Sequence, residues 1–326
     1  MQIKKEVEIL KKLILIFITA ALLLTGCSGK RETVSVTVAE GSSLSQIADT
    51  LKASGLIGSR LIFKHKAKDK YPKPGTYNIL TGTSVDDIVD ILASGASDTT
   101  VIFTIPEGYS VQQIAKRADE LGICSEKDFL KAADTLEYDF AFLKNLGIDG
   151  SVKYKLQGFL YPNTYFVEKN TAAKEVVKLL LGEFENQLNQ NNIPYDDLYR
   201  TVTVASLLQR EALLDSEKAK IAGVIENRLK AGMLLQIDAS VVYGVTDGQY
   251  NVTAVYNKDL KSNSPYNLYK YKGLPPGPIC NPDITSIKAA RSPEKHDYLY
   301  YRTDEKKNDG SHIFTKTYEE HLNANN

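Results

Sequence analysis

One glutamate stands at a position where its carboxyl group could do acid–base chemistry. Residues 199–214 have the pattern of a helix, with Val204, Leu207 and Leu208 on one apolar stripe. Glu211 continues that stripe, three residues after Leu208. A carboxylate on an apolar face is costly when ionised, so we expect its pKa to be raised. A pKa near ~6, against ~4.3 for a free Glu, suits a general acid at neutral pH.

The same position also has a purely structural interpretation. A buried Glu211 could be held in an ion pair by Arg210, Arg228 or Lys218. Arg228, on the next predicted helix, is the cation that we expect to pair with an acid. Periodicity alone favours this structural pairing over a functional acid, so the following segments must decide.

A rigid loop follows these two helices. The second helix is predicted over residues 216–232, with Ser216 as its cap. Residues 273–282 read GLPPGPICNP, a sequence that can be neither helix nor central strand. Rigid loops that bear Asn, Gln and Tyr often present polar groups and flat aromatic faces to a sugar.

Four further residues between the helices and this loop are candidate site residues. Gln236 and Asp238 follow the second helix, and we expect them to position a substrate or to give structural polar support. Tyr266 and Asn267 are candidates for contacts with a sugar. Glu217, the other nearby acid, is expected on a solvated helix face.

The composition limits the class of protein. The chain has 326 residues, and its 40 Lys and Arg balance its 40 Asp and Glu. Without a basic excess, nucleic acid is not an expected partner. Apolar residues make up 43%, which indicates a folded chain, and the length suggests two domains. The three Cys and four His lack zinc-site spacing, so we expect no metal, cofactor or disulfide framework.

Residues 1–26 have the features of a signal peptide or membrane anchor. Lysines precede the apolar run 13–24, which is shorter than the ~20 residues that span a bilayer. The run ends in LTGC, which resembles the lipobox of bacterial lipoproteins and implies acylation of Cys27. The alternative is an uncleaved transmembrane helix. Both interpretations tether the remaining chain to the outer face of the cytoplasmic membrane, with residues 27–32 as the tether.

A short pattern of strand and capped helix recurs in the first half of the chain. The copies are residues 38–48, 82–95 and 105–115, and the β-rich stretches before their helices are residues 33–38, 75–80 and 99–105. Ser43 with Gln46, and Ser110 with Gln113, have the spacing of a capping box. The pattern resembles the LysM-like module of cell-wall proteins, whose grooves hold N-acetylglucosamine chains. The alternative is a scaffold without glycan affinity.

The ordered motifs of the second half resemble the MltG/YceG family of endolytic murein transglycosylases. In chain order they are ASLLQRE, VIENRLKAGMLLQIDASVVYG, SPYNLY, GLPPGPICNP and DYLYYR. The resemblance includes the earlier segment LQGFLYPNTYF and places the family's catalytic Glu on Glu211. Gln157 and Asn163 stand where the family usually has Glu and Asp, Gln209 replaces a frequent Glu, and Leu268 replaces a Thr.

The resemblance implies an enzyme that cleaves the β-1,4 bond between N-acetylmuramic acid and N-acetylglucosamine without water. It would leave 1,6-anhydro ends and limit the length of nascent strands. Glu211 would act first as acid and then as base, without the second carboxylate of an ordinary glycosidase. The implied partners are peptidoglycan strands, the membrane and a peptidoglycan synthase. The alternatives are a non-catalytic wall-binding scaffold lipoprotein and a hydrolysing muramidase.

These expectations combine into an α+β fold class. Small LysM-like strand and helix modules over residues 33–165 precede a mixed, largely helical catalytic domain over residues 166–326. An amphipathic helix over residues 172–190 would begin that domain.

Overall fold

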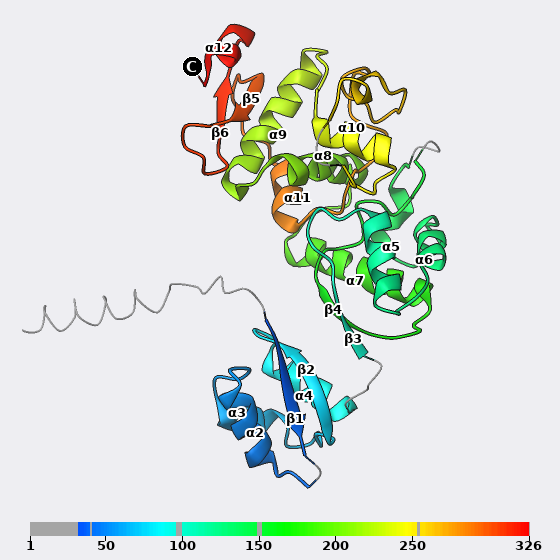
Figure 1. The fold of residues 1–326 in the computed structure, drawn as a ribbon, viewed down its shortest axis with the longest axis vertical. Helices are drawn as coiled ribbons and strands as arrows, with labels where there is room; N and C mark the ends of the chain where they lie inside the picture. The colour runs from blue at the N-terminus through cyan, green and yellow to red at the C-terminus, as the bar shows by residue number, and fades with distance from the viewer. Residues whose placement is uncertain (1–31, 40, 96–99, 149–151, 253–254, 326) are drawn as a thin grey trace, which may run out of the picture. The chain divides into compact units, whose positions relative to one another are not determined.

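The computed structural model describes residues 32–39, 41–95, 100–148, 152–252 and 255–325. The chain divides into two compact units, Met1–Asp98 and Thr99–Asn326 (Figure 1). The expected signal or anchor and Cys27 lie outside the described residues. Among the described residues, no helix combines the length and the apolar character needed to cross a membrane.

The first unit packs helices on a two-stranded antiparallel sheet. Its elements are β1 (Thr33–Val38), α2 (Leu44–Ala53), α3 (Arg60–Lys66), β2 (Gly75–Leu80) and α4 (Val85–Ser94). Both strands have the predicted bounds. The predicted capping box is confirmed, because Ser43 and Gln46 each cap the other's backbone N–H. Leu51, Phe63 and Ile79 are fully buried and form the centre of this unit's own core.

The second unit is α+β and largely helical, as predicted for the catalytic part. Its elements are β3 (Thr100–Thr104), α5 (Val111–Glu120), α6 (Glu126–Ala133), the 3-10 turn η1 (Ala141–Asn145), β4 (Thr164–Glu168), α7 (Ala173–Gln190), α8 (Leu198–Glu211), α9 (Asp215–Lys230), α10 (Asp238–Thr246), the 3-10 turn η2 (Asp259–Lys261), α11 (Ile284–Arg291), β5 (Tyr300–Thr303), β6 (His312–Thr315) and α12 (Tyr318–Asn323). One continuous core joins α5 to α11.

The units divide at a different place from the expected boundary between residues 165 and 166. That boundary falls inside β4, which pairs antiparallel with β3, so that Thr104 faces Thr164. A lone strand leaves backbone groups unpaired, and β3 finds its partner 60 residues later rather than within its own repeat. The repeat copy with the Ser110–Gln113 capping box, which is confirmed, therefore belongs to the second unit.

The helix that bears Glu211 has the predicted apolar stripe but ends earlier. Val204, Leu207 and Leu208 are at most 1% exposed. The helix ends at Glu211 because Ala212 adopts an extended conformation, with φ −94° and ψ 120°. The next helix begins at Asp215 without a side-chain cap, so the prediction of Ser216 as its cap is wrong.

Asn281, in the Gly- and Pro-rich loop before α11, ties distant segments of the second unit together. Its Oδ1 accepts hydrogen bonds from the backbone N–H groups of Gly158 (3.0 Å) and Leu160 (2.9 Å). Its Nδ2 donates to the carbonyl of Tyr109 at 2.8 Å. The side chain is fully buried, so it holds the LQGFLYP segment and the start of α5 to the loop beside α8.

Replacing this amide tests whether the loop holds the second unit together. We expect Asn281→Ala to destabilise that unit by about 2–4 kcal/mol, because two buried N–H groups lose their acceptor. Calorimetry should show a lower transition temperature for this unit and no change in that of the first. The exposed Asn251→Ala is the control. Equal effects of the two variants would contradict the assigned role.

Candidate active site

Distant segments of the second unit meet around a cavity of about 710 Å³. They are the end of α8, the residues before α10, and the β5–β6 hairpin with α12, which lies beside α9 (Figure 1). The lining includes Glu211, Gln236, Asp238, Tyr269, Tyr301 and Tyr318. A cavity of this size is suited to holding part of a small organic or sugar ligand.

Glu211 is the last residue of α8, where the buried stripe meets the cavity. Burial is the largest influence on its carboxyl group and raises its pKa above the ordinary 4.5. The negative charge of Asp238 adds to this rise, whereas a hydrogen bond from Tyr301 opposes it. The raised pKa agrees with the expectation from the apolar stripe.

Tyr301 on β5 orients this carboxyl group. Its hydroxyl donates to Oε2 of Glu211 at 2.7 Å. Burial and the adjacent carboxylate raise the pKa of Tyr301 well above its ordinary value, so it remains a donor at neutral pH. Among the described residues Oε1 of Glu211 has no hydrogen-bond partner, which leaves that oxygen for a ligand.

His312 and Glu217 form a second interacting pair next to Tyr301. The ring of His312 on β6 meets the Tyr301 ring edge-on, with centroids 5.5 Å apart. Glu217 accepts hydrogen bonds from Nδ1 of His312 at 2.7 Å and from its backbone N–H at 3.0 Å. The expectation that Glu217 lies on a solvated face is therefore wrong, because its carboxylate holds the hairpin to α9.

The cations considered as ion-pair partners of Glu211 are engaged elsewhere. Lys218 is buried and binds Asp283 at 3.1 Å and Asp215 at 2.7 Å. The guanidinium of Arg210 lies over the ring of Tyr250, 4.1 Å from its centroid. Within the described residues Glu211 forms no salt bridge, so the structural pairing is wrong.

Arg228 binds backbone carbonyl groups next to the cavity and does not pair with an acid among the described residues. Its Nε donates to the carbonyl of Leu299 at 2.6 Å, and its Nη1 donates to that of Leu235 at 2.8 Å. The expectation that Arg228 pairs with an acid does not hold. The residue fastens the start of β5 to the segment before α10, and so holds two walls of the cavity together.

Gln236 and Asp238 lie in the cavity with Glu211, as the sequence suggested. Both side chains are exposed. Gln236 has a positive φ of 55°, a strained conformation for a residue with a side chain, and its N–H donates to the carbonyl of Leu268 at 3.0 Å. Asp238 accepts a hydrogen bond of 2.6 Å from the hydroxyl of Tyr269.

Tyr266 and Asn267 lie outside the lining, in contrast to the expectation. Asn267 is fully buried, and its Nδ2 donates to the carbonyls of Leu260 and Ser262 at 2.9 Å each. Tyr266 is 7% exposed and packs against Tyr243. These buried side chains support the loop that carries Tyr269 and offer no exposed surface to a sugar. The structure therefore differs from the predicted direct contacts of Tyr266 and Asn267 with a sugar.

Sequence reasoning missed the three residues that surround the two acids. Tyr269 and Tyr301 belong to segments that were considered only as family motifs, SPYNLY and DYLYYR, and His312 was considered only as one of four His without zinc-site spacing. An alternating strand over the DYLYYR motif was the available signal, because it places Tyr301 on one face. Within the described ranges no group of three or more His, Cys, Asp or Glu side chains could hold a metal ion.

A larger cavity of about 1110 Å³ lies between α9 and the segment after α11. Both of its arginines form ion pairs: Arg200 with Glu226 at 2.6 Å, and Arg291 with Asp196 at 2.5 Å. It contains none of the predicted site residues. We therefore place the candidate site in the smaller cavity.

Comparisons with known proteins show the family to which the chain is similar. A family model described as the YceG-like family matches residues 36–326. The endolytic murein transglycosylase of Bacillus subtilis (strain 168) is 34% identical over 312 residues, 90% of this chain and 84% of the relative. That of Streptococcus pneumoniae serotype 2 is 30% identical over 307 residues, 85% of this chain and 55% of the relative.

One solved structure gives a similar result. The crystal structure of a yceG-like protein from Listeria monocytogenes matches with a TM-score of 0.59 and 31% sequence identity. The match covers 90% of this chain and 100% of the other.

The hydrogen bond from Tyr301 can be tested by its removal. Tyr301→Phe should raise the pKa of Glu211 further, because the ionised carboxylate loses a donor worth about 1.5–3 kcal/mol in its favour. The pH dependence of the carboxyl ¹³C shift measures this. The neighbouring Tyr298→Phe is the control. A Glu211 pKa that is unchanged or lower in Tyr301→Phe would contradict the assignment.

Burial of Glu211 also predicts a pH-dependent cost in stability. Its folded pKa exceeds the unfolded value, so wild-type stability falls as the pH rises from about 4.5 to the folded pKa. Glu211→Gln lacks this loss, so its advantage in unfolding free energy should grow with pH over that window. Denaturant unfolding measures it, beside the exposed Glu137→Gln. A constant difference between Glu211→Gln and wild type would show that the carboxyl group is not buried.

Proposed function

The chain belongs to the YceG-like family of peptidoglycan transglycosylases, and we propose from that premise that Glu211 is its single acid and base. The bond cleaved is the β-1,4 link from N-acetylmuramic acid to N-acetylglucosamine, inside a strand. The observation that supports this proposal is the partly buried Glu211, with one oxygen held by Tyr301 and the other without a partner among the described residues.

The proposed reaction transfers two protons, the first from Glu211 and the second to it. Protonated Glu211 gives its proton to the glycosidic oxygen as the bond from that oxygen to C1 breaks. The C6 hydroxyl oxygen of the same muramoyl residue then bonds to C1, and its proton passes to the Glu211 carboxylate. The products are a free N-acetylglucosamine hydroxyl and a 1,6-anhydro end, and Glu211 is protonated again. No water enters, and the raised pKa of Glu211 favours the protonated form that the first step needs.

The position of Asp238 is the observation that favours a second candidate reaction, hydrolysis of the glycan as in a muramidase. It lines the same cavity as Glu211, and a second carboxylate could activate a water or form a glycosyl intermediate. In the structure its Oδ1 accepts the Tyr269 hydroxyl, an arrangement suited to binding a hydroxyl group. We assign Asp238 and Gln236 to substrate positioning.

The proposed setting is the outer face of the cytoplasmic membrane, next to nascent strands and their synthases. The apolar run before Cys27 supports a tether, either through acylation of Cys27 or as a retained helix. Cutting strands close to where they are made would limit their length. The repeat region would then act as a wall-binding or spacing element.

The central test is digestion of purified glycan strands by wild type and by Glu211→Gln. We expect the variant to fold and to lose product formation by 10²-fold or more, because the amide cannot transfer the proton. Chromatography of soluble fragments measures the rate. Equal rates would overturn the proposal, and wild-type binding without cleavage would support the scaffold alternative.

The mass of the new ends separates the two enzymatic reactions. A transglycosylase leaves anhydro ends that are lighter than reducing ends by one water molecule. We expect anhydro ends from wild type and also from Asp238→Asn, whose rate should fall by up to ~10-fold through weaker substrate positioning. Reducing ends from wild type, lost in Asp238→Asn, would establish a muramidase.

A further inference from the structure

We propose that Tyr318 is a sugar-stacking subsite on the α12 wall of the Glu211 cavity. Its ligand class is a pyranose ring of the glycan strand, near the bond that is cut. This identification of the ligand rests on the proposed function. The subsite itself rests on the placement of an exposed aromatic ring in the cavity, next to residues that hold the ring in place.

Tyr318 is 59% exposed, although it lines the cavity that contains Glu211. An aromatic ring left in water loses the favourable free energy of burial, unless a ligand covers it. One face of a pyranose ring presents C–H bonds, which suit the negative face of an aromatic ring. A sugar strand that passes Glu211 could therefore cover this ring.

Neighbouring rings hold Tyr318 in place. The ring of His321 stacks near it, with centroids 6.2 Å apart and planes 28° apart. The ring of Tyr300 lies 5.9 Å from Tyr318 on another side. Burial and the nearby Arg302 and Arg228 lower the pKa of His321, so it stays a neutral ring at pH 7.

The backbone below Tyr318 is fixed as well. Thr317 and Glu320 form a capping box at the start of α12, in which each side chain binds the other residue's backbone N–H. Tyr318 is the first residue of this helix, directly after the cap. A ring that is already held in position loses less conformational entropy when a sugar binds to it.

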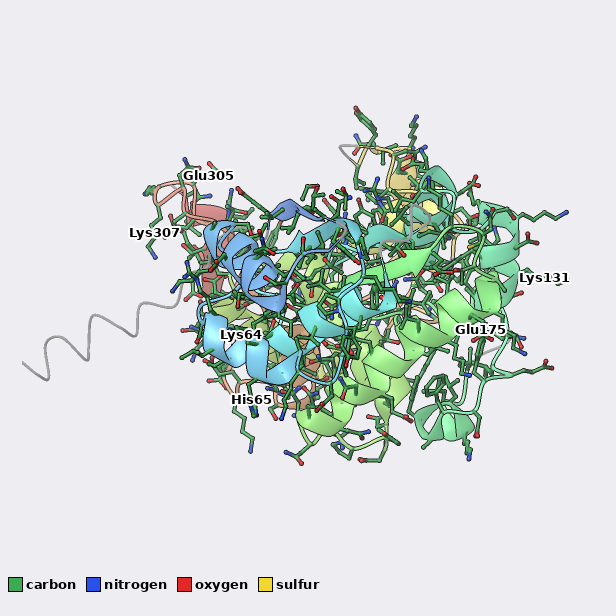
Figure 2. All side chains as sticks on the ribbon, turned by 90° about the horizontal axis from the view of Figure 1, so that it is seen from below. Lys64, His65, Lys131, Glu175, Glu305 and Lys307 are labelled. Carbon is green, nitrogen blue, oxygen red and sulfur yellow. The ribbon has the colours of Figure 1, made fainter. Side chains whose placement is uncertain are left out.

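Polar groups beside Tyr318 fit the rim of a sugar ring. Arg302 and Glu305 line the same cavity, with 3.6 Å between Nη2 and Oε1. Figure 2 shows Glu305 and Lys307 at the outer edge of the turn between β5 and β6. Hydroxyl and acetamido groups can accept from the guanidinium and donate to the carboxylate. We therefore favour the sugar over the stem peptide as the stacked group.

The chain contains no Trp, so a single tryptophan at position 318 reports on this site alone. The experiment uses full-length Glu211→Gln with Tyr318→Trp, titrated with peptide-free glycan oligomers. Stacking should change the tryptophan emission in a saturable way. The control is Glu211→Gln with Tyr256→Trp, an exposed position outside the cavity lining. No change at 318, or an equal change at both positions, would overturn the subsite.

Kinetics of otherwise wild-type protein give a second readout. Tyr318→Ala should raise KM for peptide-free strands about three- to tenfold, whereas Tyr318→Phe should stay within about twofold of wild type. Leu322→Ala, another exposed apolar residue of α12, is the matched control. An unchanged KM in Tyr318→Ala would contradict the proposal. If wild type cleaves nothing, the proposed function fails, while the emission titration still decides whether sugar binds at Tyr318.

Discussion

The hydrogen bond from Tyr301 to Glu211 is the interaction on which the rest of the site depends. Burial alone raises the pKa of the Glu211 carboxyl group and so disfavours its ionised form, without fixing the orientation of the group. The Tyr301 hydroxyl stabilises the ionised form, which the proposed reaction needs between its two proton transfers, and it fixes one of the two carboxyl oxygens. These two effects are what the proposed reaction requires of one carboxyl group that serves as acid and then as base.

Tyr301 and Glu211 are 90 positions apart in the sequence. The fold of the second unit places the Tyr301 hydroxyl 2.7 Å from Oε2 of Glu211. Arg228 joins the start of β5 to the wall that carries Gln236, and Glu217 joins α9 to His312 on the adjacent strand. Both residues hold segments of the fold together through these hydrogen bonds. Charged side chains near the acid thus build the walls of the cavity, because their partners are backbone groups and a histidine rather than Glu211 itself.

Sequence patterns correctly predicted the features that depend on residues close together in the chain. The apolar stripe at Val204, Leu207 and Leu208 correctly predicted the raised pKa of Glu211, and each of the two capping boxes was predicted from the spacing of one Ser and one Gln. The hydrogen bond from Tyr301 to Glu211 and the pairing of β3 with β4 join distant segments, and the periodicity of one segment does not show which other segment it contacts. Tyr266 and Asn267 have the types of sugar-binding residues, but burial, which decides their role, is a property of the folded loop.

In the proposed reaction the C6 hydroxyl of the muramoyl residue, and not water, attacks C1. Cleavage of glycan strands by wild-type protein in ¹⁸O-labelled water measures this most directly. We predict new muramoyl ends that are anhydro and contain no ¹⁸O. Stoichiometric ¹⁸O at those ends from the earliest time points would show that water attacks C1, and would contradict the central role given to Glu211 as the base for the C6 hydroxyl.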